Sequence, residues 1–77
     1  MAKHTVRIVE IENDYNKRLE ALLDQSFPND DISVYLGSGG YVFEINGEVR
    51  GSRTLTTSDL LEKQIRGIVE EFIKGKS

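Results

Sequence analysis

The sequence predicts an α/β (α+β) fold, a two-layer sandwich in which a mixed four-stranded sheet carries two helices on one face. Two amphipathic helical patterns occupy residues 15–27 and 61–73, and Asn46-Gly47 between them is a hairpin signal. A β-branched segment precedes the first helical pattern, so the element order is βαβββα. The first βαβ unit is right-handed, which places its helix on one face of the sheet, and the last helix returns to that face.

The first strand and helix are predicted within residues 5–27. Residues 5–11 are β-branched and nearly continuously apolar, which favours a central strand covered on at least one face. Asn13 or Asp14 caps the helix that follows, and Pro28 ends it. The apolar stripe of this helix consists of Tyr15, Leu19, Leu22, Leu23 and Phe27.

Two strands follow the turn-forming residues 28–31. Residues 32–36 alternate Ile, Val and Leu with Ser and Tyr at the two-residue period of a half-buried strand. The glycine-rich residues 37–40 connect this strand to the next, over residues 41–45, which shows the same alternation.

The next turn predicts a tight hairpin. Asn46 and Gly47 supply the two positive-φ residues of a type I′ turn, so a fourth strand runs from Glu48 towards Leu55. Gly51 weakens the middle of that strand, and we expect a β-bulge there.

The last element is a strongly amphipathic helix. Asp59 followed by Glu62 resembles a capping box, and the helix runs to about Lys74 with Gly75 as its C-cap. Its apolar stripe consists of Leu61, Ile65, Ile68, Val69, Phe72 and Ile73.

Length and composition indicate one domain over residues 1–77, with net charge −3 and no cysteine. A chain of this size buries only about 60% of its unfolded surface, and a homodimer buries more. The lack of cysteine excludes thiol chemistry by this chain. No secretory leader or membrane span is visible, so we expect the protein to be cytoplasmic. We also expect a homodimer, because of the small core, and no cofactor.

Acidic residues are concentrated in the first half of the chain. Residues 10–31 carry seven acids and two bases, a net charge of −5, which repels a phosphate backbone and disfavours direct nucleic-acid binding. Two interpretations stay open: a solvated surface, or an acidic face that binds a basic protein. The candidate partner-binding residues are Glu10, Glu12, Asp14, Glu20, Asp24, Asp30 and Asp31.

The glycine-rich hairpin resembles a known family. Residues 37–45, Gly-Ser-Gly-Gly-Tyr-Val-Phe-Glu-Ile, followed by Asn-Gly-Glu-Val at 46–49 and Ser-Arg at 52–53, are similar to the selenoprotein W-type (Rdx) thioredoxin-like family. The family's redox C-x-x-C or C-x-x-U motif corresponds to residues 12–15, which contain no sulfur. The resemblance therefore implies either a fold retained after its chemistry was lost or a common βαβββα arrangement reached independently.

Other chemistry has weaker support. His4 lies in the N-terminal segment, where we expect it to be exposed and inert. Glu10, Glu12 and Asp14 form a string rather than the convergent oxygen ligands of a metal site. Residues 37–40 lack the spacing and lysine of a phosphate-binding loop, so we interpret them as a structural turn.

These observations predict a non-enzymatic interaction module. In its sharper form, the protein is an inhibitor whose acidic face imitates nucleic acid and occupies a DNA-binding protein. The alternative is a degenerate selenoprotein W-like protein that docks redox partners without thiol chemistry. Two further hypotheses are a small enzyme that uses carboxylates or His4, and direct nucleic-acid binding. The basic residues for the latter are Arg7, Arg50, Arg53 and Lys63.

Overall fold

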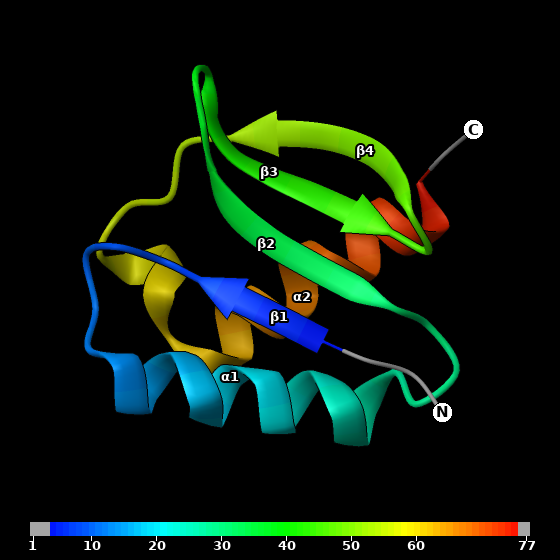
Figure 1. Cartoon of the computed structure of the whole chain (residues 1–77), viewed down its shortest axis with the longest axis horizontal. Helices are drawn as coiled ribbons and strands as arrows, with labels where there is room; N and C mark the ends of the chain where they lie inside the picture. The colour runs from blue at the N-terminus through cyan, green and yellow to red at the C-terminus, as the bar shows by residue number, and fades with distance from the viewer. Residues whose placement is uncertain (1–3, 76–77) are drawn as a thin grey trace.

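The computed structural model describes residues 4–75 and confirms the two-layer βαβββα sandwich. Its elements are β1 (His4–Arg7), α1 (Asn13–Ser26), β2 (Ile32–Gly37), β3 (Gly40–Ile45), β4 (Glu48–Arg53), a 3₁₀ turn (Ser58–Leu60) and α2 (Glu62–Lys74). The strand order is β1-β2-β3-β4, with β1 parallel to β2 and the other neighbours antiparallel. Both helices lie on the same side of the sheet (Figure 1).

The first strand differs from its prediction in length and position. It ends at Arg7 instead of residue 11, and it is an edge strand, not a central one. Its apolar run has another cause: Val6 and Ile8 are buried in the core, whereas Val9 is 65% exposed. A continuous apolar run that extends past the end of a short edge strand was therefore interpreted as a central strand.

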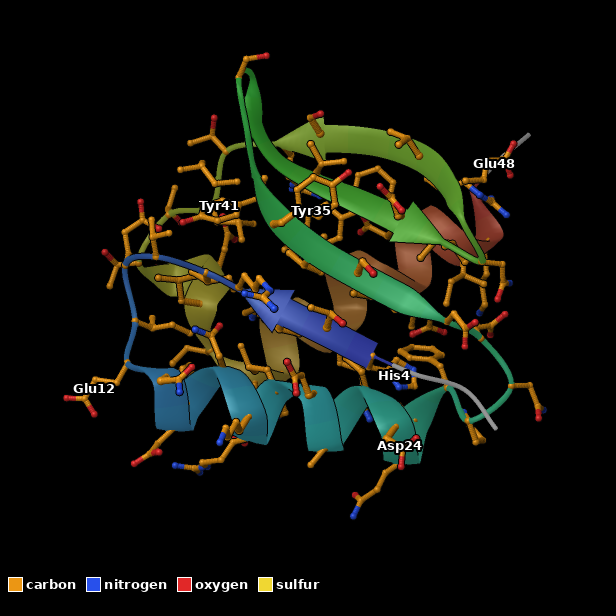
Figure 2. The ribbon with its side chains drawn as sticks, in the orientation of Figure 1. His4, Glu12, Asp24, Tyr35, Tyr41 and Glu48 are labelled. Carbon is orange, nitrogen blue, oxygen red and sulfur yellow. The ribbon has the colours of Figure 1, made fainter. Side chains whose placement is uncertain are left out.

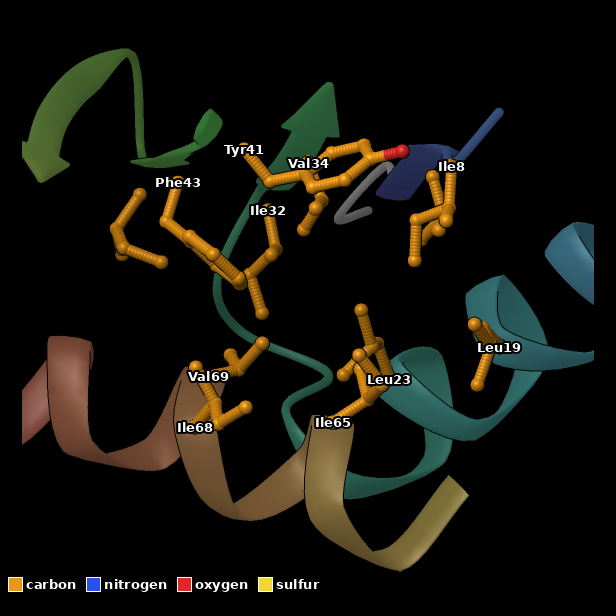
Figure 3. Close-up of a cluster of buried hydrophobic side chains, with 12 residues drawn as sticks. Ile8, Leu19, Leu23, Ile32, Val34, Tyr41, Phe43, Ile65, Ile68 and Val69 are labelled. Atoms are coloured by element: carbon orange, nitrogen blue, oxygen red, sulfur yellow. The ribbon is translucent and has the colours of Figure 1, made fainter. Parts of the chain in front are cut away.

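The core fills the space between the sheet and the two helices (Figure 3). Phe43 of β3 stacks on Phe72 of α2 with ring centroids 4.8 Å apart, an arrangement that adds to the hydrophobic effect of burying both rings. Two residues that the apolar patterns placed in the core lie outside the core. Leu36 is 52% exposed at the end of β2, and Leu61 is 59% exposed at the N-cap of α2. Each sits at an element terminus, where the periodic pattern no longer fixes the direction of the side chain.

The predicted hairpin is confirmed. Asn46 and Gly47 have φ values of 54° and 82°, as a type I′ turn requires. The register places Glu44 opposite Val49 and Phe43 opposite Gly51, so Arg50 is the extra residue of a β-bulge.

The helix caps differ from those predicted. Glu12 precedes α1 and makes no side-chain capping bond, while Asn13 and Asp14 lie inside the helix. The capping box predicted from Asp59 and Glu62 forms three residues earlier, between Thr56 and Asp59: Thr56 Oγ1 and its backbone N–H both donate to Asp59 Oδ2 at 3.0 Å. These bonds lie at the start of the 3₁₀ turn, whose N-cap residue Thr57 makes no side-chain capping bond, and α2 begins only after Leu61.

Candidate functional site

Five of the seven predicted carboxylates lie on α1 or between β1 and α1, and Asp30 and Asp31 lie in the loop between α1 and β2. We call the surface formed by these seven residues the acidic edge. β1 and α1 run in opposite directions (Figure 1), so the end of β1 meets the start of α1. In Figure 2, Glu12 stands at the start of α1 and Asp24 near its end. The structure therefore strings the carboxylates along one side and does not gather them into one cluster.

The middle of the acidic edge holds the backbone of β1. Glu20 Oε2 accepts a hydrogen bond from Val6 N at 2.9 Å. Asn16, one helical turn earlier, bonds both backbone polar groups of Ile8. Two side chains of α1 thus satisfy backbone groups on the free side of the edge strand, which leaves that side closed to another strand. Glu20 has a structural task in addition to its charge.

Sequence reasoning missed the role of Asn16. This residue is 7% exposed, and it shares the buried face of α1 with Leu19 and Leu23. A polar side chain at a core position of a helical stripe needs hydrogen-bond partners, because an unpaired buried amide is costly. That position within the stripe was the available signal.

Glu10 contacts the core through Tyr41. The Tyr41 hydroxyl accepts a hydrogen bond from Val9 N at 3.1 Å and donates to the Glu10 carboxylate. Burial and this bond to Glu10 raise the pKa of Tyr41 above its ordinary value. Glu10 therefore anchors the chain just after β1.

Asp30 and Asp31 are joined to the hairpin turn. Asn46 Oδ1 accepts from Asp31 N at 2.8 Å, Asn46 N donates to the Asp31 carbonyl at 2.7 Å, and Asn46 Nδ2 donates to Asp30 Oδ1 at 3.0 Å. Asn46 has two roles as a result: it supplies the positive φ of the turn and it fixes the loop that precedes β2.

Glu12, Asp14 and Asp24 are the carboxylates that project most freely. Glu12 and Asp14 are exposed at the start of α1, where negative charge is stabilised by the helix dipole. The Asp24 side chain is 64% exposed, and its Oδ1 lies 3.6 Å from His4 Nδ1.

His4 corrects a prediction. The sequence predicted an exposed residue in the N-terminal segment, whereas the His4 side chain is only 2% exposed, in a strand that pairs with β2. Figure 2 shows it above the end of α1, close to Asp24. The sequence did not reveal this burial, because it depends on the parallel pairing of His4 with Ile32, which places His4 in the sheet beside Asp24 of α1.

The basic residues do not form one patch. Arg7 lies on β1, at one edge of the sheet, while Arg50 and Arg53 lie on β4 at the other edge. Arg50 donates to the Phe72 carbonyl at 3.2 Å, near the end of α2, and Lys63 lies on α2. A phosphate backbone would therefore meet these cations on separate surfaces.

The glycine connection between β2 and β3 has a steric cause. Gly40 has a φ of 121°, and a Cβ atom there would stand 2.9 Å from the Arg53 carbonyl oxygen. Close packing of the loop against the end of β4 thus requires glycine. Within residues 4–75, no group of three or more His, Asp or Glu side chains is arranged to hold a metal ion. No helix in that range is long and apolar enough to cross a membrane.

Comparison with known proteins gives no match. The chain matches no family model, no curated protein and no solved structure.

Proposed function

We propose that this protein is a non-enzymatic, cytoplasmic interaction module that binds a basic protein through the acidic edge. In the sharper form of the proposal, the edge imitates the charge of nucleic acid and inhibits a DNA-binding protein. The observation that carries the proposal is the distribution of charge: residues 10–31 have a net charge of −5, although the whole chain has only −3.

The arrangement of the acidic edge supports this proposal. Carboxylates follow one another from the start of α1 to the loop beyond its end, as phosphates do along a strand of nucleic acid. Such a row steers a basic partner and speeds its association. The bonds of Glu10, Glu20 and Asp30 within the fold hold three of these charges in fixed positions, so binding orders fewer side chains and loses less entropy.

The experiment needs carboxylates that the fold does not use. Glu20 is unsuitable because it bonds the backbone of β1, so its replacement alters both charge and stability. Glu12 and Asp14 are exposed, and the double substitution Glu12→Gln with Asp14→Asn removes two negative charges. The matched control is Glu70→Gln with Glu71→Gln, which makes the same change in net charge on α2, where both carboxylates form only exposed ion pairs.

The protein and both double variants are immobilised and exposed to extract of the native cell. We expect a basic protein to be retained by the wild type and by the control, to be lost with the Glu12 and Asp14 variant, and to be displaced by duplex DNA. Equal retention by both double variants contradicts binding through the acidic edge. Retention that duplex DNA does not affect contradicts nucleic-acid mimicry and leaves binding of a basic protein.

A second candidate is a redox-fold protein that docks redox partners without thiol chemistry. The βαβββα order favours it, because the resemblance to the selenoprotein W-type family implies that same order. Thioredoxin-system enzymes among the retained proteins, with binding unchanged in the Glu12 and Asp14 variant, would support this candidate over the first.

A further inference from the structure

The two edge strands of the sheet differ in whether their outward-facing backbone groups have hydrogen-bond partners. On β1 and one residue beyond its end, side chains of α1 bond the free backbone groups of Val6 and Ile8. On the opposite edge, the strand order ends at β4, and no strand among residues 4–75 pairs with its outer side. Unpaired backbone groups on an edge strand are a template for another strand.

The hairpin geometry determines which groups of β4 face outward. A two-residue turn makes Ile45 and Glu48 a hydrogen-bonded pair, so the ladder alternation turns the N–H and C=O of Val49 away from β3. The bulge at Arg50 delays the alternation by one residue. Ser52, opposite Val42, is therefore the next residue whose N–H and C=O face outward.

We propose that β4 pairs antiparallel with β4 of a second copy of this chain, across a two-fold axis between Arg50 and Gly51. In that register, Val49 of each copy lies opposite Ser52 of the other. The residues with outward N–H and C=O groups thus meet as hydrogen-bonded pairs. A two-fold axis repeats every contact, so the pairing uses both outward-facing residues of each strand.

Charge complementarity supports the same register. It places Glu48 of each copy opposite Arg53 of the other. Both residues belong to the helix-side face of the sheet, since they lie opposite the core residues Ile45 and Tyr41 of β3. Opposite charges at directly opposed positions stabilise a strand pair, and here the favourable pair occurs twice.

The bulge favours a second copy over an unrelated strand. A regular strand presents its hydrogen-bonding groups at every second residue, whereas β4 presents them at Val49 and Ser52, three residues apart. The hydrogen-bonding groups of a regular strand would therefore match those of β4 at only one residue pair. A second β4 carries the same bulge at the same place, so its groups match.

The present contacts of the charged residues do not prevent this pairing. Glu48 Oε1 lies 3.3 Å from Arg50 Nε, and Arg53 Nη1 lies 3.4 Å from Glu71 Oε1. The Glu48 side chain is 74% exposed and that of Arg53 is 42% exposed. The exposed Arg53–Glu71 pair contributes little and exchanges partners readily. The Arg50 side chain is only 20% exposed, and its Nη1 keeps the Phe72 carbonyl as a partner when Glu48 turns towards the second copy.

The dimer would be a continuous eight-stranded sheet with β1 at both ends. Each acidic edge would then face outward, away from the two-fold axis. The inference does not depend on the proposed function, because the outer side of β4 and the α1 carboxylates of the acidic edge, next to β1, lie at opposite edges of the sheet.

Specific protein interfaces of standard size bury at least about 1,200 Å², and pairing of two six-residue strands buries less than that. We therefore expect weak association, with a dissociation constant in the micromolar range. Sedimentation velocity of the full chain over a concentration series from about 5 to about 500 μM should show a monomer–dimer equilibrium. A wild type that stays monomeric throughout overturns the proposal.

Charge exchange tests the register. Arg53→Glu and Glu48→Arg each oppose like charges twice across the axis, so we expect each to weaken the dimer by about tenfold or more. The double variant restores opposite charges and should dimerise like the wild type. Glu71→Gln removes the present partner of Arg53 without touching β4 and should leave the dimer unchanged. A dimer that resists both single exchanges, or a double variant that is as weak as the single ones, overturns the register.

Ser52→Pro tests the backbone bonds separately. Proline lacks the outward N–H and is tolerated on an edge strand at such a position. We expect this variant to be monomeric while its circular dichroism and unfolding temperature stay close to those of the wild type. A folded variant that dimerises normally overturns pairing through Ser52.

Discussion

Asn16 of α1 completes the hydrogen bonding of Ile8 beyond the end of β1. Its Oδ1 accepts from Ile8 N at 3.0 Å, and its Nδ2 donates to the Ile8 carbonyl at 3.1 Å. One side-chain amide thus offers the edge strand the donor and acceptor that a neighbouring strand would offer. Ile8 is buried, so these backbone groups would otherwise lack both water and a partner.

The first prediction follows from this contact. Asn16→Leu fills a similar volume but leaves the N–H and C=O of Ile8 unpaired, so we expect the free energy of unfolding to fall by about 2–4 kcal/mol. Urea unfolding followed by circular dichroism measures the loss. Asn13→Ala, at the exposed first residue of α1, is the control and should change stability by less than about 1 kcal/mol. A loss at Asn16 no larger than that at Asn13 contradicts the role given to this amide.

The second prediction concerns the bulge. A Cβ atom at Gly51 would lie 2.8 Å from Phe72 Cε1, and the Phe72 ring is stacked on Phe43. Gly51→Ala therefore forces the ring out of place, and we expect it to cost about 1–3 kcal/mol in thermal unfolding. At Gly39, by contrast, a Cβ atom would meet nothing within 4 Å, so Gly39→Ala should be close to neutral. Equal effects of the two substitutions on the unfolding temperature would show that the Phe72 ring moves aside without a loss of stability.

Local patterns predicted the fold because the short-range signals agree with one another. Asn46-Gly47 fixed the hairpin and its register, and the stripes of α1 and α2 identified the buried faces that cover the sheet. The central position of β1 was predicted wrongly. Its pairing partners lie more than 20 residues away in sequence, and a nearly continuous apolar run is typical of a central strand, although one helix covers this edge strand.

The acidic edge was only partly predictable. Sequence composition revealed the excess of carboxylates in residues 10–31, but it did not distinguish those that project freely from those that hold the fold. That distinction depends on contacts between distant segments. Glu20 meets Val6 across 14 residues, and Glu10 meets Tyr41 across 31. Burial of His4 depends in the same way on its pairing with Ile32.

The third prediction concerns alkaline pH. The hydrogen bond between Tyr35 and Glu44 raises the pKa of Tyr35. The pKa of Tyr41 is raised mainly by burial and, to a smaller extent, by its hydrogen bond to Glu10. The fold thus favours both neutral phenols, and this contribution to stability is present below the unfolded pKa of about 10 and is lost as pH rises through the folded pKa values. Absorbance at about 295 nm during a pH titration should show two tyrosines that ionise late.

Single substitutions assign the two late tyrosines. Tyr35→Phe and Tyr41→Phe should each remove one late step, and Glu44→Gln should lower the pKa of Tyr35 while leaving that of Tyr41 in place. An unchanged titration of Tyr35 in Glu44→Gln contradicts the bond between the two side chains as the cause of the shift.

The fourth prediction concerns acidic pH and the cap before α2. Hydrogen bonds from the backbone N–H and hydroxyl of Thr56 hold the pKa of Asp59 below its ordinary value. A folded pKa below the unfolded one contributes stability above pH about 4, and that contribution is lost as pH falls through the folded pKa. Asp59→Asn should therefore lower the unfolding temperature at pH 7, and its difference from the wild type should shrink at about pH 2.5.

Asp14→Asn provides the matched control, because it removes an exposed carboxylate from the first turn of α1 and leaves the capping box intact. Thr56→Val should reproduce part of the Asp59 effect at pH 7, since it removes the hydroxyl that donates to this carboxylate but keeps the backbone N–H bond and the side-chain volume. If the difference between Asp59→Asn and the wild type were the same at both pH values, ionisation of Asp59 would not stabilise the cap. The hydrogen bonds of Thr56 would then stabilise it equally well with a neutral acceptor.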